Sequence, residues 1–147
     1  MKDPARIGAL ARWHLLFGLT FAGLGMVLGI YMAISQNHSE MPAHAHIMLL
    51  GFVVSTIYAL VYQLWLKATG VRLALVQTAL HEIGATVLSI GLVLMFGGFA
   101  TEDSVGPLLG IGAFLALGGV LLMIWQVARI GQETRAPDAS PAISGAM

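Results

Sequence analysis

Five histidines offer most of the chemistry in this 147-residue sequence: His14, His38, His44, His46 and His81. Imidazole nitrogens bind metal ions and exchange protons near neutral pH, so these residues indicate a metal, haem or proton site. The chain has no cysteine, which excludes thiolate ligands, iron–sulfur clusters and covalently attached c-type haem. Any metal must therefore be bound by histidine, methionine or carboxylate.

The two closest histidines, His44 and His46, follow directly after Met41-Pro42. Proline fits the first turn of a helix, so the pair is predicted near a helix start. Residues two apart on a helix differ by about 200° in direction, which sends the two imidazoles to opposite sides and lets one helix serve two sites. In an irregular segment, His38, Met41, His44 and His46 would instead converge on a soft copper site. Both interpretations stay open on the residues alone.

Two further histidines have simpler explanations. His38 lies in a polar connection, where a solvated imidazole needs no partner. His14 follows Arg12 and Trp13 close to the start of the first apolar stretch, which suits an interfacial position or a hydrogen bond to a neighbour. A ligand role for His14 is the less favoured interpretation.

His81 is deeper in its apolar stretch, about 13 Å from Arg72 at 1.5 Å per residue. It stands beside Glu82 and one turn after Gln77. These three residues predict either a small polar network inside the bundle or a functional role for His81 as ligand or proton relay.

The composition is that of a membrane protein, whose membrane-spanning segments must position these residues. The chain is 58% hydrophobic and 10% charged, with a mean hydropathy of +0.86. Seven basic residues balance seven acidic ones, so no basic surface is left for nucleic acid. The expected surroundings are therefore membrane lipid.

Four apolar stretches, 13–34, 47–66, 73–100 and 105–127, are each long enough to cross a bilayer, which takes about 20 residues. They predict an all-α fold, a four-helix membrane bundle, with helices at about 10–35, 43–67, 71–100 and 105–131. Residues 1–131 then form one transmembrane domain. The polar tail 132–147 is expected to be disordered on the cytoplasmic side.

Charge in the connections predicts the orientation. The basic residues all fall at one end of the predicted bundle: Lys2, Arg6, Arg12, Lys67, Arg72, Arg129 and Arg135. The other end carries Glu40, Glu102 and Asp103. Because cytoplasmic connections are enriched in Lys and Arg, both termini are expected in the cytoplasm, with the chain in a bacterial inner membrane.

The segment Pro42-Ala-His44-Ala-His46-Ile-Met-Leu-Leu-Gly51-Phe52 resembles the histidine-bearing helices of the haem–copper oxidase catalytic subunit and its nitric oxide reductase relatives. It is similar also to small four-helix bacterial proteins described as cytochrome oxidase subunit I-like. A glycine-rich first helix ending Leu-Gly-Ile-Tyr-Met-Ala and a third helix with His81-Glu-Ile-Gly84 fit the same pattern.

The resemblance implies that the chain corresponds to one four-helix arc of a catalytic subunit built from three such arcs. In that family a His-x-His pair serves two haems, one on each side of its helix, which implies haem iron at His44 and His46. A homotrimer would mimic the whole subunit. The chain has no counterpart of the copper-binding helix, so the resemblance implies no complete oxygen-reducing site, and the catalytic residues are unknown.

Depth in the membrane indicates which histidines share an iron. His46 is about 30 Å above Leu66, whereas His81 is about 13 Å above Arg72, so the two do not lie level within one chain. Two copies of the second helix would bring their histidines level, which favours haem at a subunit boundary in a trimer or, next, a dimer. The GxxxG pattern from Gly25 to Gly29 permits close helix packing within a subunit or between subunits.

The leading hypothesis is a b-type haem protein with axial ligands His44 and His46, and with His81 or His14 as less favoured ligands. Its expected role is electron transfer or gas sensing beside respiratory oxidases, with a respiratory-chain partner or a quinone among the candidate partners. One alternative is a copper-binding or copper-delivery protein, and another is a structural subunit of a respiratory complex. Nucleotide-binding, GxSxG and HExxH motifs are absent from the sequence.

Overall fold

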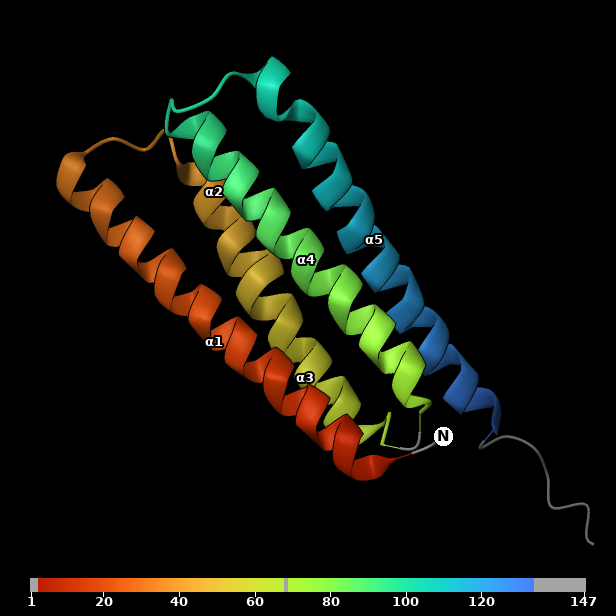
Figure 1. The fold of residues 1–147 in the computed structure, drawn as a ribbon. Helices are drawn as coiled ribbons and strands as arrows, with labels where there is room; N and C mark the ends of the chain where they lie inside the picture. The colour runs from red at the N-terminus through yellow and green to blue at the C-terminus, as the bar shows by residue number, and fades with distance from the viewer. Residues whose placement is uncertain (1–2, 68, 134–147) are drawn as a thin grey trace, which may run out of the picture.

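A computed structural model describes residues 3–67 and 69–133, almost all of them helical (Figure 1). The order of elements is α1 (Pro4–Ser35), α2 (Met41–His46), the π-helix η1 (Ile47–Val54), α3 (Ser55–Leu64), α4 (Val71–Phe96) and α5 (Glu102–Glu133). Because α2, η1 and α3 follow one another without a break, they make one span, Met41–Leu64. Four helices in this part of the chain are long and apolar enough to cross a membrane, which confirms the predicted all-α class and number of spans.

Local capping sets helix boundaries that differ from the predicted ones. α1 begins at Pro4 rather than near residue 10, because the Asp3 side chain accepts hydrogen bonds from the backbone N–H groups of Ala5 and Arg6. α4 ends at Phe96 rather than at residue 100, and Gly98 after it has a positive φ of 76°. α5 begins at Glu102 rather than at residue 105.

The predicted tail 132–147 is only partly tested. Gln132 and Glu133 belong to α5, so the expectation of disorder is wrong for these two residues. Residues 134–147 lie outside the described residues.

The second span is not the regular helix that the sequence predicts over 43–67. Its middle, Ile47–Val54, is a π-helix, in which backbone hydrogen bonds join residues five apart. Within this span the carbonyl of Phe52 accepts a hydrogen bond from the Thr56 hydroxyl at 2.8 Å. A carbon atom added at Gly18 of α1 would stand 3.1 Å from that carbonyl oxygen, so the two spans pack closely here.

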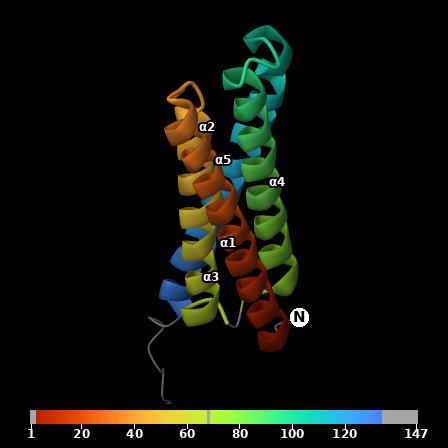
Figure 2. The same ribbon diagram turned by 90° about the vertical axis from the view of Figure 1, so that its left-hand side faces the viewer.

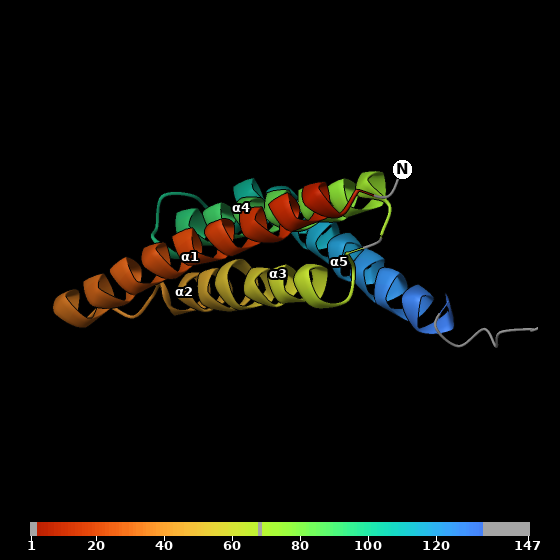
Figure 3. The ribbon, with the colours of Figure 1, turned by 90° about the horizontal axis from the view of Figure 1, so that it is seen from below.

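The helices form two packed pairs. α5 lies against α4, and α1 lies against η1 and α3 (Figures 1 and 3). Glycines let the first pair approach, since a carbon atom added at Gly84 would be 2.5 Å from the backbone nitrogen of Ala116. Gly25 and Gly29, the GxxxG pair, face Met48 and His44, so this pattern is used for packing within the chain.

The bundle buries a group of polar side chains beside its apolar core and exposes many large apolar side chains, which is an arrangement that a lipid environment favours. Among the fully buried side chains are His14, Gln77 and His81. Leucine, isoleucine and valine side chains of all four spans are exposed instead. The start of α1 and the end of α5 lie at the same end of the bundle (Figure 1).

Candidate functional site

The histidine pair, His44 and His46, lies in α2, just before the π-helix. His44 is half-buried and faces α1, where its Nδ1 atom is 3.0 Å from the carbonyl oxygen of Gly25. His46 is exposed, and its Nδ1 atom is 2.8 Å from the carbonyl oxygen of Pro42 in the same helix. The two rings therefore point in different directions, as the helical spacing predicts.

Both rings have the hydrogen-bonding pattern of a histidine prepared to bind a metal. A carbonyl oxygen only accepts, so Nδ1 of each ring must carry the hydrogen, and Nε2 keeps its lone pair. Histidines that bind metals commonly donate their other N–H to a carbonyl or carboxylate, which holds the ring in place. The carbonyls of Gly25 and Pro42 supply that support here.

The four residues of the predicted copper site do not converge. α2 is a regular helix through His44 and His46, so the irregular backbone that this site requires is not present. His38 and Met41 are both exposed. Over residues 3–67 and 69–133, no three histidine, aspartate or glutamate side chains are grouped as a metal site.

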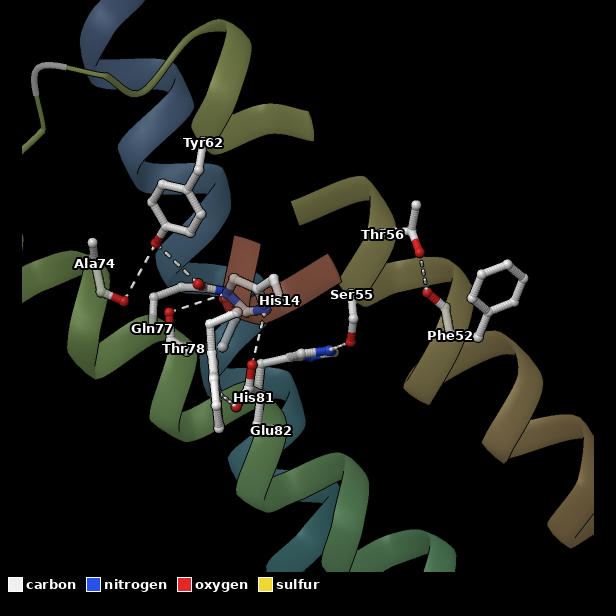
Figure 4. Close-up of polar contacts among 12 residues, drawn as sticks. His14, Phe52, Ser55, Thr56, Tyr62, Ala74, Gln77, Thr78, His81 and Glu82 are labelled. Carbon is white, nitrogen blue, oxygen red and sulfur yellow. Dashed lines mark hydrogen bonds and ion pairs between the residues drawn. The ribbon is translucent and has the colours of Figure 1, made fainter. Parts of the chain in front are cut away.

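The second polar region is in the interior, where side chains from α1, α3 and α4 meet (Figure 4) and Gln126 of α5 joins them through Tyr62. We call it the buried polar cluster, and its members are His14, Ser55, Tyr58, Tyr62, Gln77, Thr78, His81, Glu82 and Gln126. The ring centroids of His14 and His81 are 6.0 Å apart. Both histidine side chains are fully buried.

Of the two surroundings that the sequence suggests for His14, the structure shows the hydrogen bond to a neighbour. Because α1 begins at Pro4, His14 is ten residues, or about 15 Å, into the helix. Its Nε2 atom is 3.0 Å from the Thr78 hydroxyl, and its Nδ1 atom is 3.3 Å from Oε1 of Glu82. The indole N–H of Trp13 donates to Oε2 of the same carboxyl group at 2.7 Å.

His81 belongs to a polar network, but its partner is not the expected one. Its Nε2 atom is 2.9 Å from the hydroxyl of Ser55 across the bundle, and Tyr58 packs edge-on at 4.7 Å between ring centroids. Its Nδ1 atom has no partner of hydrogen-bonding geometry in the described part of the chain, although the backbone of Leu50 lies close. Gln77, His81 and Glu82 each find partners on other helices: Gln77 meets Tyr62, His81 meets Ser55, and Glu82 meets Trp13.

A further series of hydrogen bonds extends from the cluster to the connection between α3 and α4. The Tyr62 hydroxyl donates to Gln77 Oε1 at 3.0 Å and accepts from Gln126 Nε2 at 3.3 Å. Gln126 Oε1 in turn accepts from the Thr69 hydroxyl at 3.3 Å. The side-chain amide of Gln77 donates to the carbonyl of Gly119 on α5 at 3.4 Å. We call Thr69, Gln126, Tyr62 and Gln77 the connecting series.

Several cluster residues were not singled out from the sequence. Their signal is the helical spacing of polar side chains inside apolar spans. Ser55, Tyr58 and Tyr62 share one face of their helix, and Thr78 lies one turn before Glu82 on α4. No other polar side chain of the apolar stretch 105–127 lies one turn from Gln126, so only the structure identifies Gln126 as a member of the cluster.

The two histidine groups lie at different depths. His81 contacts Ser55, which is nine residues beyond His46 and therefore about 14 Å further along the span. This separation agrees with the expected difference in height.

An apolar groove in the surface is distinct from both groups. It lies between the outer halves of α1 and α4, which diverge in Figure 2, and has a volume of about 620 Å³. Apolar side chains such as Phe21, Leu24 and Val93 line most of it.

No protein-family model, curated protein or solved structure matches this chain.

Proposed function

We propose that this chain is an integral membrane protein that binds b-type haem through His44 and His46 and serves in electron transfer. The observation that carries the proposal is the state of the two rings. Each has Nδ1 engaged by a backbone carbonyl and Nε2 left with its lone pair. The resemblance of residues 42–52 to haem-bearing oxidase helices supports the same assignment.

The chain's own residues orient the ligands. The carbonyl of Gly25 fixes His44 against α1, and the carbonyl of Pro42 fixes His46 at the opposite side of α2. A haem held by two imidazoles supplies one-electron transfer and has no open axial position for oxygen. His14 and His81 are left out of the ligand set because their Nε2 atoms meet the hydroxyls of Thr78 and Ser55 in the interior.

The exposure of His46 supports a haem at a boundary between subunits. An imidazole at the membrane is costly when nothing covers it, and a second copy of the chain would supply a ligand at the same height. We propose a homotrimer, with a dimer as the next choice. We also propose that the chain lies in a bacterial inner membrane, with the histidine pair near the periplasmic face.

Substitution of single histidines tests the haem site. His46→Ala should abolish haem binding, and His44→Ala should lower the haem content or give a high-spin spectrum, because one axial bond is lost. His38→Ala is the matched control, since His38 is an exposed residue of the connection before α2. The measurement is the visible spectrum and haem content of the purified full-length protein.

The same preparation distinguishes the other functions. Copper without haem in a metal analysis would support copper binding, and the absence of both would support a structural subunit. A His46→Ala protein with a full haem complement and an unchanged spectrum would overturn the proposal.

A further inference from the structure

An acid and a base are paired in the interior, away from the histidine pair. Glu82 is near the middle of α4, and its side chain is 12% exposed, whereas His14 is fully buried. An isolated charge at this depth is costly. Oε1 of Glu82 and Nδ1 of His14 are 3.3 Å apart without hydrogen-bonding geometry, so neither atom is saturated.

The contacts of the pair suit two protonation states. Without a proton on its carboxyl group, Glu82 is stabilised by the N–H of Trp13, which donates to Oε2. With a proton, Glu82 and His14 are both neutral, and this form avoids the desolvation of a buried ion pair. The Thr78 hydroxyl beside Nε2 of His14 can donate or accept, so it follows either form of the ring.

The other groups around the pair are neutral or weakly acidic. On α3 the titratable side chains are Tyr58 and Tyr62, and on α4 the neighbour is His81. From α5, Gln126 enters the network as an uncharged amide. The side chains of the cluster that can take up or release a proton near neutral pH are therefore Glu82, His14 and His81.

We propose that Glu82 and His14 form a proton-binding site within the membrane, which takes up one proton from the aqueous phase and returns it as the pH changes. The proton is bound on the carboxyl group of Glu82 and leaves it as a carboxylate that Trp13 stabilises. The site does not depend on the haem assignment. A purely structural polar cluster would pack the same helices without exchanging a proton.

Infrared spectroscopy of the full-length protein in lipid nanodiscs tests the site. As the pH is lowered, a carboxylic acid C=O band should appear in the wild type and be missing in Glu82→Gln. Trp13→Phe removes the N–H that stabilises the carboxylate, so the band should persist to higher pH. A band that is absent, or that does not change with pH, would overturn the proposal.

Discussion

The hydrogen bond of one ring nitrogen distinguishes the histidines of this chain. In His44 and His46, Nδ1 donates to a carbonyl, so Nε2 remains for a metal. In His14 and His81, Nε2 instead meets a hydroxyl in the interior. The proposed iron ligands and the histidines of the buried polar cluster therefore differ in which ring nitrogen is hydrogen-bonded to the protein.

A carboxyl group at the outer end of the bundle predicts a pH-dependent stability. Glu40 is buried, and a carbon atom added at Gly97 would be 2.5 Å from its Oε1 atom. Burial raises the pKa of Glu40 above the ordinary glutamate value. The folded state then binds this proton more tightly than the unfolded state does, so its stabilising effect is full at acidic pH and is lost as the pH rises through the raised pKa.

Glu40→Gln should remove this part of the pH dependence, because the amide does not titrate. The measurement is the thermal unfolding temperature in mild detergent across the acidic to neutral range. Glu102→Gln is the control, since Glu102 is exposed at the same end and should leave the pH profile as in the wild type. A Glu40→Gln profile equal to that of the wild type would contradict the assignment.

At the scale of the helix, small residues decide how closely α4 and α5 pack. The two backbones are in close contact at Gly84, Gly112 and Gly119. A carbon atom added at any of these glycines would stand 2.5, 2.8 or 3.0 Å, respectively, from a backbone nitrogen of the facing helix. This close contact also brings Gly119 to Gln77, whose amide donates to the Gly119 carbonyl at 3.4 Å. Helix packing and the connecting series are thus linked.

Gly84→Ala should lower the free energy of unfolding by about 1–3 kcal/mol, because the added carbon meets backbone atoms that cannot rotate away. Gly110→Ala on α5 is the matched control, since a carbon atom there meets nothing within 4 Å. It should leave the stability unchanged or raise it. Detergent-induced unfolding followed by circular dichroism measures both, and equal losses in the two variants would refute the role given to Gly84.

At the scale of the whole molecule, the bundle has a polar interior and an apolar surface, with both described chain ends on one side (Figure 1). The exposed basic side chains Arg6, Arg12, Lys67 and Arg72 belong to that same end. The other end holds the connection before α2 and the connection between α4 and α5. This asymmetry of charge is the physical basis for the proposed orientation.

The orientation predicts where fused reporters function. A reporter that is active only in the cytoplasm should work when fused after Met147, and one that needs the periplasm should work when inserted after Asn37. The reverse result would place the histidine pair at the cytoplasmic face, because the bundle has an even number of spans.

The proposed homotrimer should have a definite mass and a definite ratio of haem to protein. In mild detergent or nanodiscs, the protein should have the mass of a trimer, and haem should be lost together with the oligomer. His46→Ala should weaken the assembly because His46 is the exposed ligand, whereas His38→Ala should not. A monodisperse monomer with one haem bound by two histidines would sink the shared-site proposal.

The sequence by itself determined the all-α class, the four spans and the divergence of His44 from His46. These properties are local, since hydropathy over about 20 residues and the angle between neighbours on a helix need no knowledge of other segments. The depth of His46 relative to His81 follows from the same helical rise.

Only the tertiary structure decided which polar side chains meet. The contacts of Trp13 with Glu82, of Ser55 with His81 and of Tyr62 with Gln126 join different helices, and a shift of one residue in packing would exchange the partners. The burial of His14 likewise comes from contacts with Tyr62 on α3 and Thr78 on α4. Partners across helices depend on crossing geometry and close contacts, which periodicity within one segment does not contain.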